Sequence, residues 1–167
     1  TASEVQGLRT ELQSWEGATA ARRLDPHLVV RSIWANRDPR HFQSPEFLKL
    51  KDEIASAGGN KQAIKVRPLA VGSDGVQRYE VCFGHRRHQA CLELGLPVLA
   101  LIDSVSDVVL FIEMERENRE RQDLTPWEQG RHYQLSLERG LFPSNRKLAK
   151  AIGVDLSNLG KALSLAN

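Results

Sequence analysis

Two adjacent arginines follow a glycine at the point where a strand-like run gives way to a helical one. Residues 79–83 alternate as a strand does, and the run after Gly84 has helical spacing and stops at Gly95. Gly84 is therefore predicted at a strand-to-helix corner, where the missing Cβ permits a tight turn or the close approach of a ligand. Arg86 and Arg87 add guanidinium donors to the free N–H groups of the first helical turn, which favours a phosphate. A solvated basic turn, with the arginine stems packed over the surface, is the alternative that these residues leave open.

A carboxylate and an amide are neighbours on a helix predicted from about Ser106. Helical spacing places Glu117 and Asn118 on the extension of the apolar face, so they do not point straight to solvent. A carboxylate there needs a partner, and a bound cation can supply it. One carboxylate and one amide oxygen, with phosphates completing the shell, suit Mg²⁺. The alternative is an ion pair between Glu117 and Arg121, worth only about 0.3–0.5 kcal/mol on a helix surface.

Residues 144–166 have the spacing of a helix-turn-helix. A small residue, a glycine four positions later and an apolar residue six further on are Ala149, Gly153 and Leu159. The second helix is then predicted to lie in the major groove of DNA. The residues predicted to contact DNA are two on the first helix, toward phosphates, and three on the second, nearest the bases or phosphates: Arg146, Lys150, Ser157, Asn158 and Lys161.

Three segments in the right order resemble the signatures of the ParB family of partition proteins. Residues 84–90, Gly-His-Arg-Arg-His-Gln-Ala, are similar to the family's Gly-Glu-Arg-Arg-x-Arg-Ala. Residues 117–126 resemble Glu-Asn-x-Gln-Arg-x-Asp-Leu-x-Pro, and residues 62–68 resemble Gln-Pro-Ile-x-Val-Arg-Pro. Any one segment alone would be weak, whereas the three together make a specific match over residues 36–167.

The resemblance implies a nucleotide-binding domain that acts as a switch, joined to a DNA-binding domain. It implies CTP bound with Mg²⁺, the triphosphate at residues 84–87 and the metal at Glu117 and Asn118. It further implies a clamp dimer that loads at a centromere-like site on double-stranded DNA and slides, with a ParA-type ATPase as a partner of regions outside this chain. The nucleotide-binding residues that it implies are Gln62, Ala63, Ile64, Gly84, His85, Arg86, Arg87, Glu117, Asn118 and Arg121.

Two positions depart from the family's pattern. His85 stands where the family usually has Glu, a position tied there to nucleotide turnover, and Ala63 stands where the loop usually has Pro. Gln62 and His85 are the residues through which the resemblance implies catalysis. Binding of CTP is therefore expected, whereas hydrolysis of CTP stays open and would be slow.

Two other interpretations use the same residues. One is a helix-turn-helix transcriptional regulator whose N-terminal domain is degenerate and binds no nucleotide. The other is an enzyme on the related sulfiredoxin-like fold, transferring phosphate or reducing sulfur. Sulfiredoxins place a cysteine directly after the glycine, where this chain has His85, and Cys82 lies before Gly84 in the predicted strand, so the enzyme is disfavoured.

Periodicity and the resemblance together predict an α+β fold, a small mixed-sheet domain of ParB/sulfiredoxin-like type followed by an all-α helix-turn-helix domain. The predicted divisions are an N-terminal amphipathic helix and linker over 1–19, the nucleotide-binding domain over 20–123 and the DNA-binding domain over 124–167. The family's C-terminal dimerisation domain has no counterpart here, so the chain is expected to be a fragment. The predicted helices span 3–15, 45–57, 85–94, 106–123, 126–139, 145–152 and 156–166. Ser44, Thr125 and Ser144 are predicted as the N-caps of the helices that follow them. The predicted strands span 28–34, 64–71, 76–83 and 97–102, the last buried on both faces, with a linker at 17–23 and a hairpin turn at 73–75 between the second and third strands.

Charge is distributed unevenly along the 167 residues, although the net charge is only +2. Residues 61–88 carry six basic and two acidic side chains, residues 103–128 three basic and eight acidic, and residues 131–167 six basic and two acidic. This pattern indicates a basic site, an acidic helix beside it and a basic terminal module. No apolar run approaches the ~20 residues that span a bilayer, and two cysteines without metal spacing fit a reduced compartment. A cytoplasmic location, on the nucleoid or a plasmid and without a membrane partner, is expected.

Overall fold

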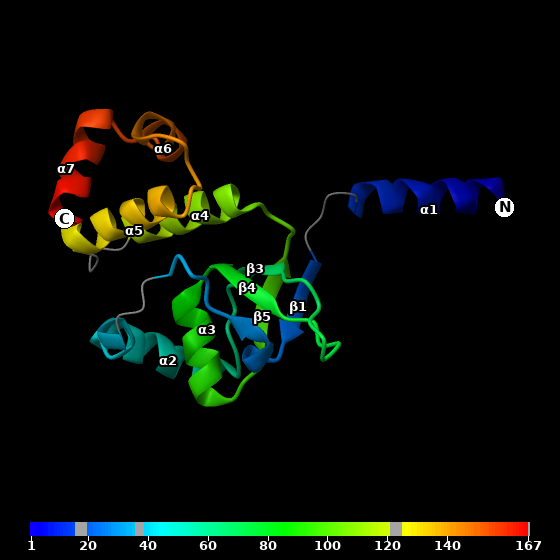
Figure 1. The fold of residues 1–167 in the computed structure, drawn as a ribbon. Helices are drawn as coiled ribbons and strands as arrows, with labels where there is room; N and C mark the ends of the chain where they lie inside the picture. The colour runs from blue at the N-terminus through cyan, green and yellow to red at the C-terminus, as the bar shows by residue number, and fades with distance from the viewer. Residues whose placement is uncertain (16–19, 36–38, 121–124, 167) are drawn as a thin grey trace.

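The computed structural model describes residues 1–15, 20–35, 39–120 and 125–166, and it confirms the α+β fold (Figure 1). Strands and helices are interspersed up to residue 102, and only helices follow among the described residues. The strands are β1 (Ala20–Leu24), β2 (Val29–Val30), β3 (Ile64–Pro68), β4 (Tyr79–Phe83) and β5 (Val98–Ile102). The helices are α1 (Ala2–Trp15), α2 (Pro45–Ala57), α3 (His85–Leu94), α4 (Asp107–Glu120), α5 (Pro126–Glu138), α6 (Asn145–Ile152) and α7 (Leu156–Ala166), with 3-10 turns η1 (Pro26–Leu28) and η2 (Pro39–Phe42).

The strands form one mixed sheet in the order β1-β5-β3-β4-β2. The β3–β4 and β1–β5 pairs are antiparallel, whereas β3–β5 and β2–β4 are parallel. The predicted hairpin between β3 and β4 is confirmed, with Gly75 at φ 73° in its turn, although β3 ends at Pro68 and β4 begins at Tyr79, so both are shorter than predicted. Helices α2 and α3 cover one face of the sheet, and the core there includes Phe47, Ile54, Val66, Val81, Ala90 and Cys91.

Helix α4 packs on β4 from the other side and joins the sheet to the C-terminal helices. Successive residues of a strand point to opposite faces, so Val81 lies in the core under α2 and α3, whereas Cys82 lies in the core that contains Phe111 of α4. The Phe111 ring meets Trp34 edge-on at 5.7 Å between centroids and Phe142 edge-on at 5.6 Å. A single hydrophobic cluster therefore includes residues of the sheet, of α4 and of the helices after it.

Several predicted strand boundaries are wrong, because pairing between distant segments decides them. Residues 20–23, predicted as a linker, belong to β1, which pairs antiparallel with β5 although its Ala-Ala-Arg-Arg sequence has little strand propensity. Of the strand predicted over 28–34, only Val29–Val30 remain, since η1 includes Leu28 and the chain turns at residues 33–34. Strand β5 is not buried on both faces: Val98 and Ala100 are fully buried, but the residues between and after them are half-buried, because α4 packs mainly over β4.

The predicted helix N-caps are confirmed. The hydroxyl oxygens of Ser44, Thr125 and Ser144 each accept a hydrogen bond from the backbone N–H three residues on, at 3.2, 3.1 and 3.2 Å. These bonds fix where α2, α5 and α6 begin. The predicted N-terminal helix is also present, but Val5 and Leu8 of its apolar stripe are exposed. None of the described helices has both the length and the apolar composition that crossing a membrane requires.

Candidate functional site

Gly84 is the N-cap of α3 and makes the turn from β4 into that helix. Its backbone has φ 96° and ψ 31°, in the left-handed region that favours glycine. A Cβ atom at this position would lie 2.5 Å from Cγ2 of Ile64, so the start of α3 approaches β3 closely. The predicted strand-to-helix corner is therefore confirmed, and the two arginines follow it in the first turn of α3.

The side chains of Arg87 and Asn60 fix the loop that precedes β3 through hydrogen bonds to its carbonyl oxygens. Nη1 of Arg87 donates hydrogen bonds to the carbonyl oxygens of Ala63, at 2.9 Å, and Gln62, at 3.4 Å. Nδ2 of the buried Asn60 donates to the carbonyls of Gln62, at 2.9 Å, and Leu99, at 3.0 Å. Burial lowers the pKa of Arg87 below its usual value, but a guanidinium keeps its charge in proteins. The loop is thus held in place without the proline that the family usually has in it.

The three segments singled out in the sequence meet at one pocket of about 300 Å³. The loop contributes one residue, the corner three, and α4 a row of charged side chains. The residues that line the pocket are Gln62, Phe83, Gly84, Arg87, Glu113, Arg116, Glu117 and Glu120. A second hollow of about 760 Å³ lies between α2 and residues 59–62 and shares Gln62 and Arg87 with the first. A ligand with a charged end in the first pocket therefore has room to extend past Arg87 into the second.

Glu117 faces the corner from α4. Its Oε2 accepts a hydrogen bond from the backbone N–H of Gly84 at 3.2 Å and lies 3.9 Å from Nδ1 of His85. The Glu117 carboxylate thus already accepts a hydrogen bond from an N–H at the N-terminus of α3. A phosphate oxygen would bind to the same N–H. His85 is only 8% exposed, and its Nε2 has no hydrogen-bond partner among the described residues.

The two predicted Mg²⁺ ligands differ in position. Glu117 lines the pocket, whereas Asn118 does not. Glu113 lines it as well, but this carboxylate is paired with Nζ of Lys65 at 2.6 Å. Within the described part of the chain, no group of three or more histidine, cysteine, aspartate or glutamate residues is arranged to hold a metal ion. A divalent cation here would need phosphate oxygens to complete its shell, as Mg²⁺ commonly does.

Four further predicted nucleotide-binding residues lie close to this pocket without lining it. Ile64 lies beneath Gly84, and Ala63 presents its carbonyl to Arg87. His85 and Arg86 are the first residues of α3. Arg121 lies outside the described residues. The roles of all these residues stay predictions.

Helices α6 and α7 are joined by the predicted turn. Gly153 ends α6 at φ 71°, and the N–H of Val154 donates to the carbonyl of Ala149 at 2.9 Å. Ala149 and Leu159 are buried, as the helix-turn-helix pattern requires. All five residues predicted to contact DNA are exposed, namely Arg146, Lys150, Ser157, Asn158 and Lys161. Lys147, which was not predicted, is also exposed on α6 and adds a third cation to that short helix.

Some residues that matter for the site were not predicted. Asn60 fixes the loop, and a polar cluster that includes Glu115, Arg119 and Tyr133 joins α4 to the helices after it. An asparagine after two glycines has the appearance of an ordinary loop residue. The four-residue spacing of Glu115 and Arg119 is visible in the sequence, but it is equally typical of a surface ion pair.

The similar known proteins are chromosome-partitioning proteins and proteins described as putative replication protein B. One of the latter, from Rhizobium rhizogenes, is 41% identical over 90 residues, which are 54% of this chain and 28% of that protein. No family model matches the sequence. The chromosome-partitioning protein Spo0J of Thermus thermophilus is 34% identical over 140 residues, which are 83% of this chain and 49% of that protein. The chain spans about half the length, or less, of the curated relatives it matches.

Two crystal structures of C-terminally truncated ParB, a chromosome-partitioning protein from Caulobacter crescentus, are also similar. The first, complexed to the centromeric parS site, has a TM-score of 0.55 and 22% identity, over 85% of this chain and 70% of that chain. It has the same fold as this chain. The second, complexed with CTP-γ-S, has a TM-score of 0.45 and 23% identity, over 86% of this chain and 77% of that chain.

Proposed function

Because this chain belongs to the ParB family of chromosome-partitioning proteins, we propose that it is a DNA-partition protein with a nucleotide switch. The pocket at Gly84 binds CTP with Mg²⁺, and α6 and α7 bind a centromere-like site on double-stranded DNA. Nucleotide binding favours self-association into a clamp that slides on DNA. A ParA-type ATPase is the partner of regions outside this chain, and the protein works in the cytoplasm on the nucleoid or a plasmid.

The observation that carries the proposal is the convergence of three separate segments on one pocket. Gln62 comes from a loop, Gly84 and Arg87 from a helix N-terminus, and Glu117 from a second helix. The same three segments carry the resemblance to the family. The helix N-terminus and its arginines offer the donors that a triphosphate needs, and the hollow beside Arg87 has room for a ribose and a base. The preference for CTP over other nucleotides rests on the family alone.

In this proposal a phosphate oxygen takes the place that the Glu117 carboxylate now has at the Gly84 N–H. The released Glu117 carboxylate and the Asn118 amide would be the ligands of Mg²⁺, which would neutralise charge on the phosphates. Glu117 already lines the pocket, whereas Asn118 has to turn toward it. Arg86 and Arg87 bind the phosphates, and Arg87 keeps the loop with Gln62 beside them.

Turnover of CTP is proposed to be slow, because His85 replaces the glutamate of the family. Gln62 lines the pocket and His85 starts the helix behind it, so these two stay the candidates for catalysis. If the glutamate of the family acts directly, His85→Glu should raise the rate of phosphate release from CTP above that of the wild type. Equal rates in the two proteins would remove this position from the catalytic assignment.

Calorimetric titration with each of the four nucleoside triphosphates, with Mg²⁺, tests the proposal. We expect CTP to bind and the others to bind more weakly. Arg86→Ala and Arg87→Ala should each weaken CTP binding roughly 10- to 150-fold, the equivalent of ~1.5–3 kcal/mol for a lost charge-assisted contact. Arg78→Ala is the control, since Arg78 is exposed and pairs with Asp74 at the hairpin.

A transcriptional regulator without nucleotide binding is the second candidate. The observation that favours it is that two donors of the corner are already satisfied within the protein, since Gly84 donates to Glu117 and Arg87 donates to the loop carbonyls. Sequence-specific DNA binding in a protein that gives no heat with any nucleoside triphosphate would select this candidate.

A further inference from the structure

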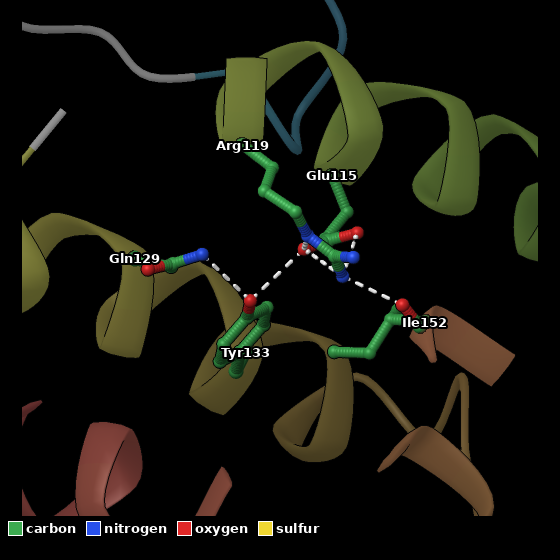
Figure 2. A network of polar contacts seen from close by, with 5 residues as sticks. All are labelled: Glu115, Arg119, Gln129, Tyr133 and Ile152. Atoms are coloured by element: carbon green, nitrogen blue, oxygen red, sulfur yellow. Dashed lines mark hydrogen bonds and ion pairs between the residues drawn. The ribbon is translucent and has the colours of Figure 1, made fainter. Parts of the chain in front are cut away.

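A chain of polar contacts links three helices (Figure 2). Nη2 of Arg119 donates to both carboxylate oxygens of Glu115, at 2.8 and 2.9 Å, and to the carbonyl of Ile152 at 2.6 Å. The Tyr133 hydroxyl donates to Oε1 of Glu115 at 3.0 Å, and Nε2 of Gln129 donates to the Tyr133 oxygen at 2.8 Å. These contacts connect α4 to α5 and to the last residue of α6.

Arg119 supplies hydrogen bonds to two acceptors that would be destabilising without a partner, the Glu115 carboxylate and the Ile152 carbonyl. Glu115 is 3% exposed, and a buried carboxylate needs a positive partner and hydrogen bonds. The Ile152 carbonyl is at the C-terminus of α6, where carbonyls lack partners within the helix and the dipole favours a cation. Burial and the neighbouring Glu115 raise the pKa of Tyr133, so its hydroxyl keeps the proton that it donates. The arrangement is therefore a specific connection between helices.

Helix α4 contacts different parts of the molecule on its two opposite sides. Residues four apart on a helix share a face, and residues two apart point about 200° from each other. Glu113 and Glu117 line the pocket at Gly84, whereas Glu115 and Arg119 contact α5 and α6. One helix thus touches the proposed nucleotide site on one side and the proposed DNA-binding helices on the other.

We propose that Arg119 is a positioning residue that transmits a displacement of Glu117 at the pocket to α6 of the helix-turn-helix. The proposal rests on the proposed function, since nucleotide binding is what separates Glu117 from the Gly84 N–H. When that bond is broken α4 shifts, and the link from Arg119 to Ile152 moves α6 with it. Helix α7 follows α6 after a short turn, so the orientation of the recognition helix changes as well. Because linkage is reciprocal, DNA bound to α6 and α7 changes the affinity for CTP by the same factor as CTP changes that for DNA.

Hydrogen exchange of the whole chain, with and without saturating CTP and Mg²⁺, tests this directly. In the wild type, CTP is expected to change amide exchange in both α4 and α6. In Arg119→Ala, CTP should still bind and still change exchange in α4, but the change in α6 should be lost. Arg131→Ala removes the same charge from the surface of α5, where Arg131 bonds to Gln134, and should behave as the wild type does.

A linkage measurement gives the size of the effect. The affinity for CTP is measured with and without a duplex that the wild-type protein selects from a random pool, and the ratio is the coupling factor. We expect Arg119→Ala to reduce that factor about 2- to 30-fold. If Arg119→Ala fails to fold, as judged by circular dichroism, the double variant Glu115→Gln, Arg119→Ala removes the stranded buried charge and allows the same measurements.

The outcomes separate this proposal from the proposed function. A wild-type protein that does not bind CTP overturns both. The other outcome is that the wild type binds CTP and couples CTP binding to DNA binding, but the Arg119 variants show the same coupling factor and the same CTP-dependent exchange in α6. That result overturns only the role of Arg119.

Discussion

A Cβ atom on Gly84 would lie 2.5 Å from Cγ2 of Ile64, so the start of α3 can approach β3 this closely only with glycine at the corner. Gly84→Ala is therefore expected to lower the free energy of unfolding by the cost of overpacking, ~1–3 kcal/mol, and by that of a positive φ, ~1–2 kcal/mol. It should also weaken CTP binding, since the N–H of Gly84 and the first turn of α3 must shift. Urea denaturation and calorimetry measure the two effects.

Gly95→Ala is the matched control, because Gly95 ends the same helix. Its φ of 68° is also positive, but nothing lies within 4 Å of the position that its Cβ would take. This variant should lose only the strain component and keep its affinity for CTP. Equal losses of stability in the two variants would contradict the packing role given to Gly84.

The corner could be predicted from the sequence because each of its signals is local. A strand-like alternation, a glycine and two arginines in a first helical turn are all contained in residues 79–95, and their geometry follows from general rules. The caps at Ser44, Thr125 and Ser144 were predicted for the same reason. The helix-turn-helix depends on a spacing of ten residues, which one short helix and one turn determine.

The remaining features depend on partners far along the chain. Strand β1 exists because it pairs with β5, and nothing in Ala20–Leu24 indicates that pairing. Asn60 is buried because Leu99 supplies its hydrogen bonds, and Glu115 is buried because Tyr133 and Arg119 satisfy it. Hydrophobic periodicity predicts which face of a helix or strand is buried, but it does not predict which distant residue packs against that face.

Glu117→Ala should separate metal binding from structure. If Glu117 holds Mg²⁺, the variant should lose the gain in CTP affinity that Mg²⁺ gives the wild type, while its affinity in EDTA stays equal or rises, since the Gly84 N–H becomes available to a phosphate. Asn118→Ala should show the same loss, and a smaller one would fit its position outside the pocket lining. Titrations with Mg²⁺ and with EDTA measure both.

Glu120→Ala is the control for charge in this pocket. Glu120 lines the pocket too, so its removal lowers the repulsion of phosphates without removing a proposed metal ligand. Glu120→Ala should therefore raise CTP affinity in Mg²⁺ and in EDTA alike. If Glu117→Ala behaves in the same way as Glu120→Ala, Glu117 is only a structural cap of Gly84.

His132 is expected to make the folded state sensitive to acid. Burial lowers its pKa to about 4, and its ring stacks on Phe111 with centroids 4.5 Å apart. A histidine whose pKa is lower in the folded state stabilises the fold above its unfolded pKa, near 6.5, and this contribution is lost as the pH falls from about 6.5 to about 4. Between neutral pH and about pH 5 the loss should be roughly 2 kcal/mol.

His132→Phe keeps an aromatic ring against Phe111 but cannot become charged. Urea unfolding at several pH values should therefore show a smaller loss of stability in acid than in the wild type. Some dependence should persist, because burial also lowers the pKa of His88. His27→Phe, at a position whose side chain is 71% exposed, should keep the loss of stability between neutral pH and about pH 5, although it also removes the contact of His27 with Asp25. An unchanged profile in His132→Phe would show that His132 is already charged, or solvated, in the folded state.

Asn158 and Lys150 are expected to contribute to DNA binding in different ways. Asn158 is exposed on α7, and an asparagine on a recognition helix can read adenine through two hydrogen bonds, worth ~1–3 kcal/mol of discrimination. Lys150 is exposed on α6, the helix that crosses the backbone in this motif, and a lysine there binds phosphate without reading sequence. Asn158→Ala should therefore bring the affinities for specific and unrelated duplexes closer together. Lys150→Ala should weaken binding to both alike and reduce the slope of log affinity against log salt by about 1. Gel shifts with both duplexes over a range of salt concentrations separate the two effects, and the opposite result for the two variants would exchange the roles of α6 and α7.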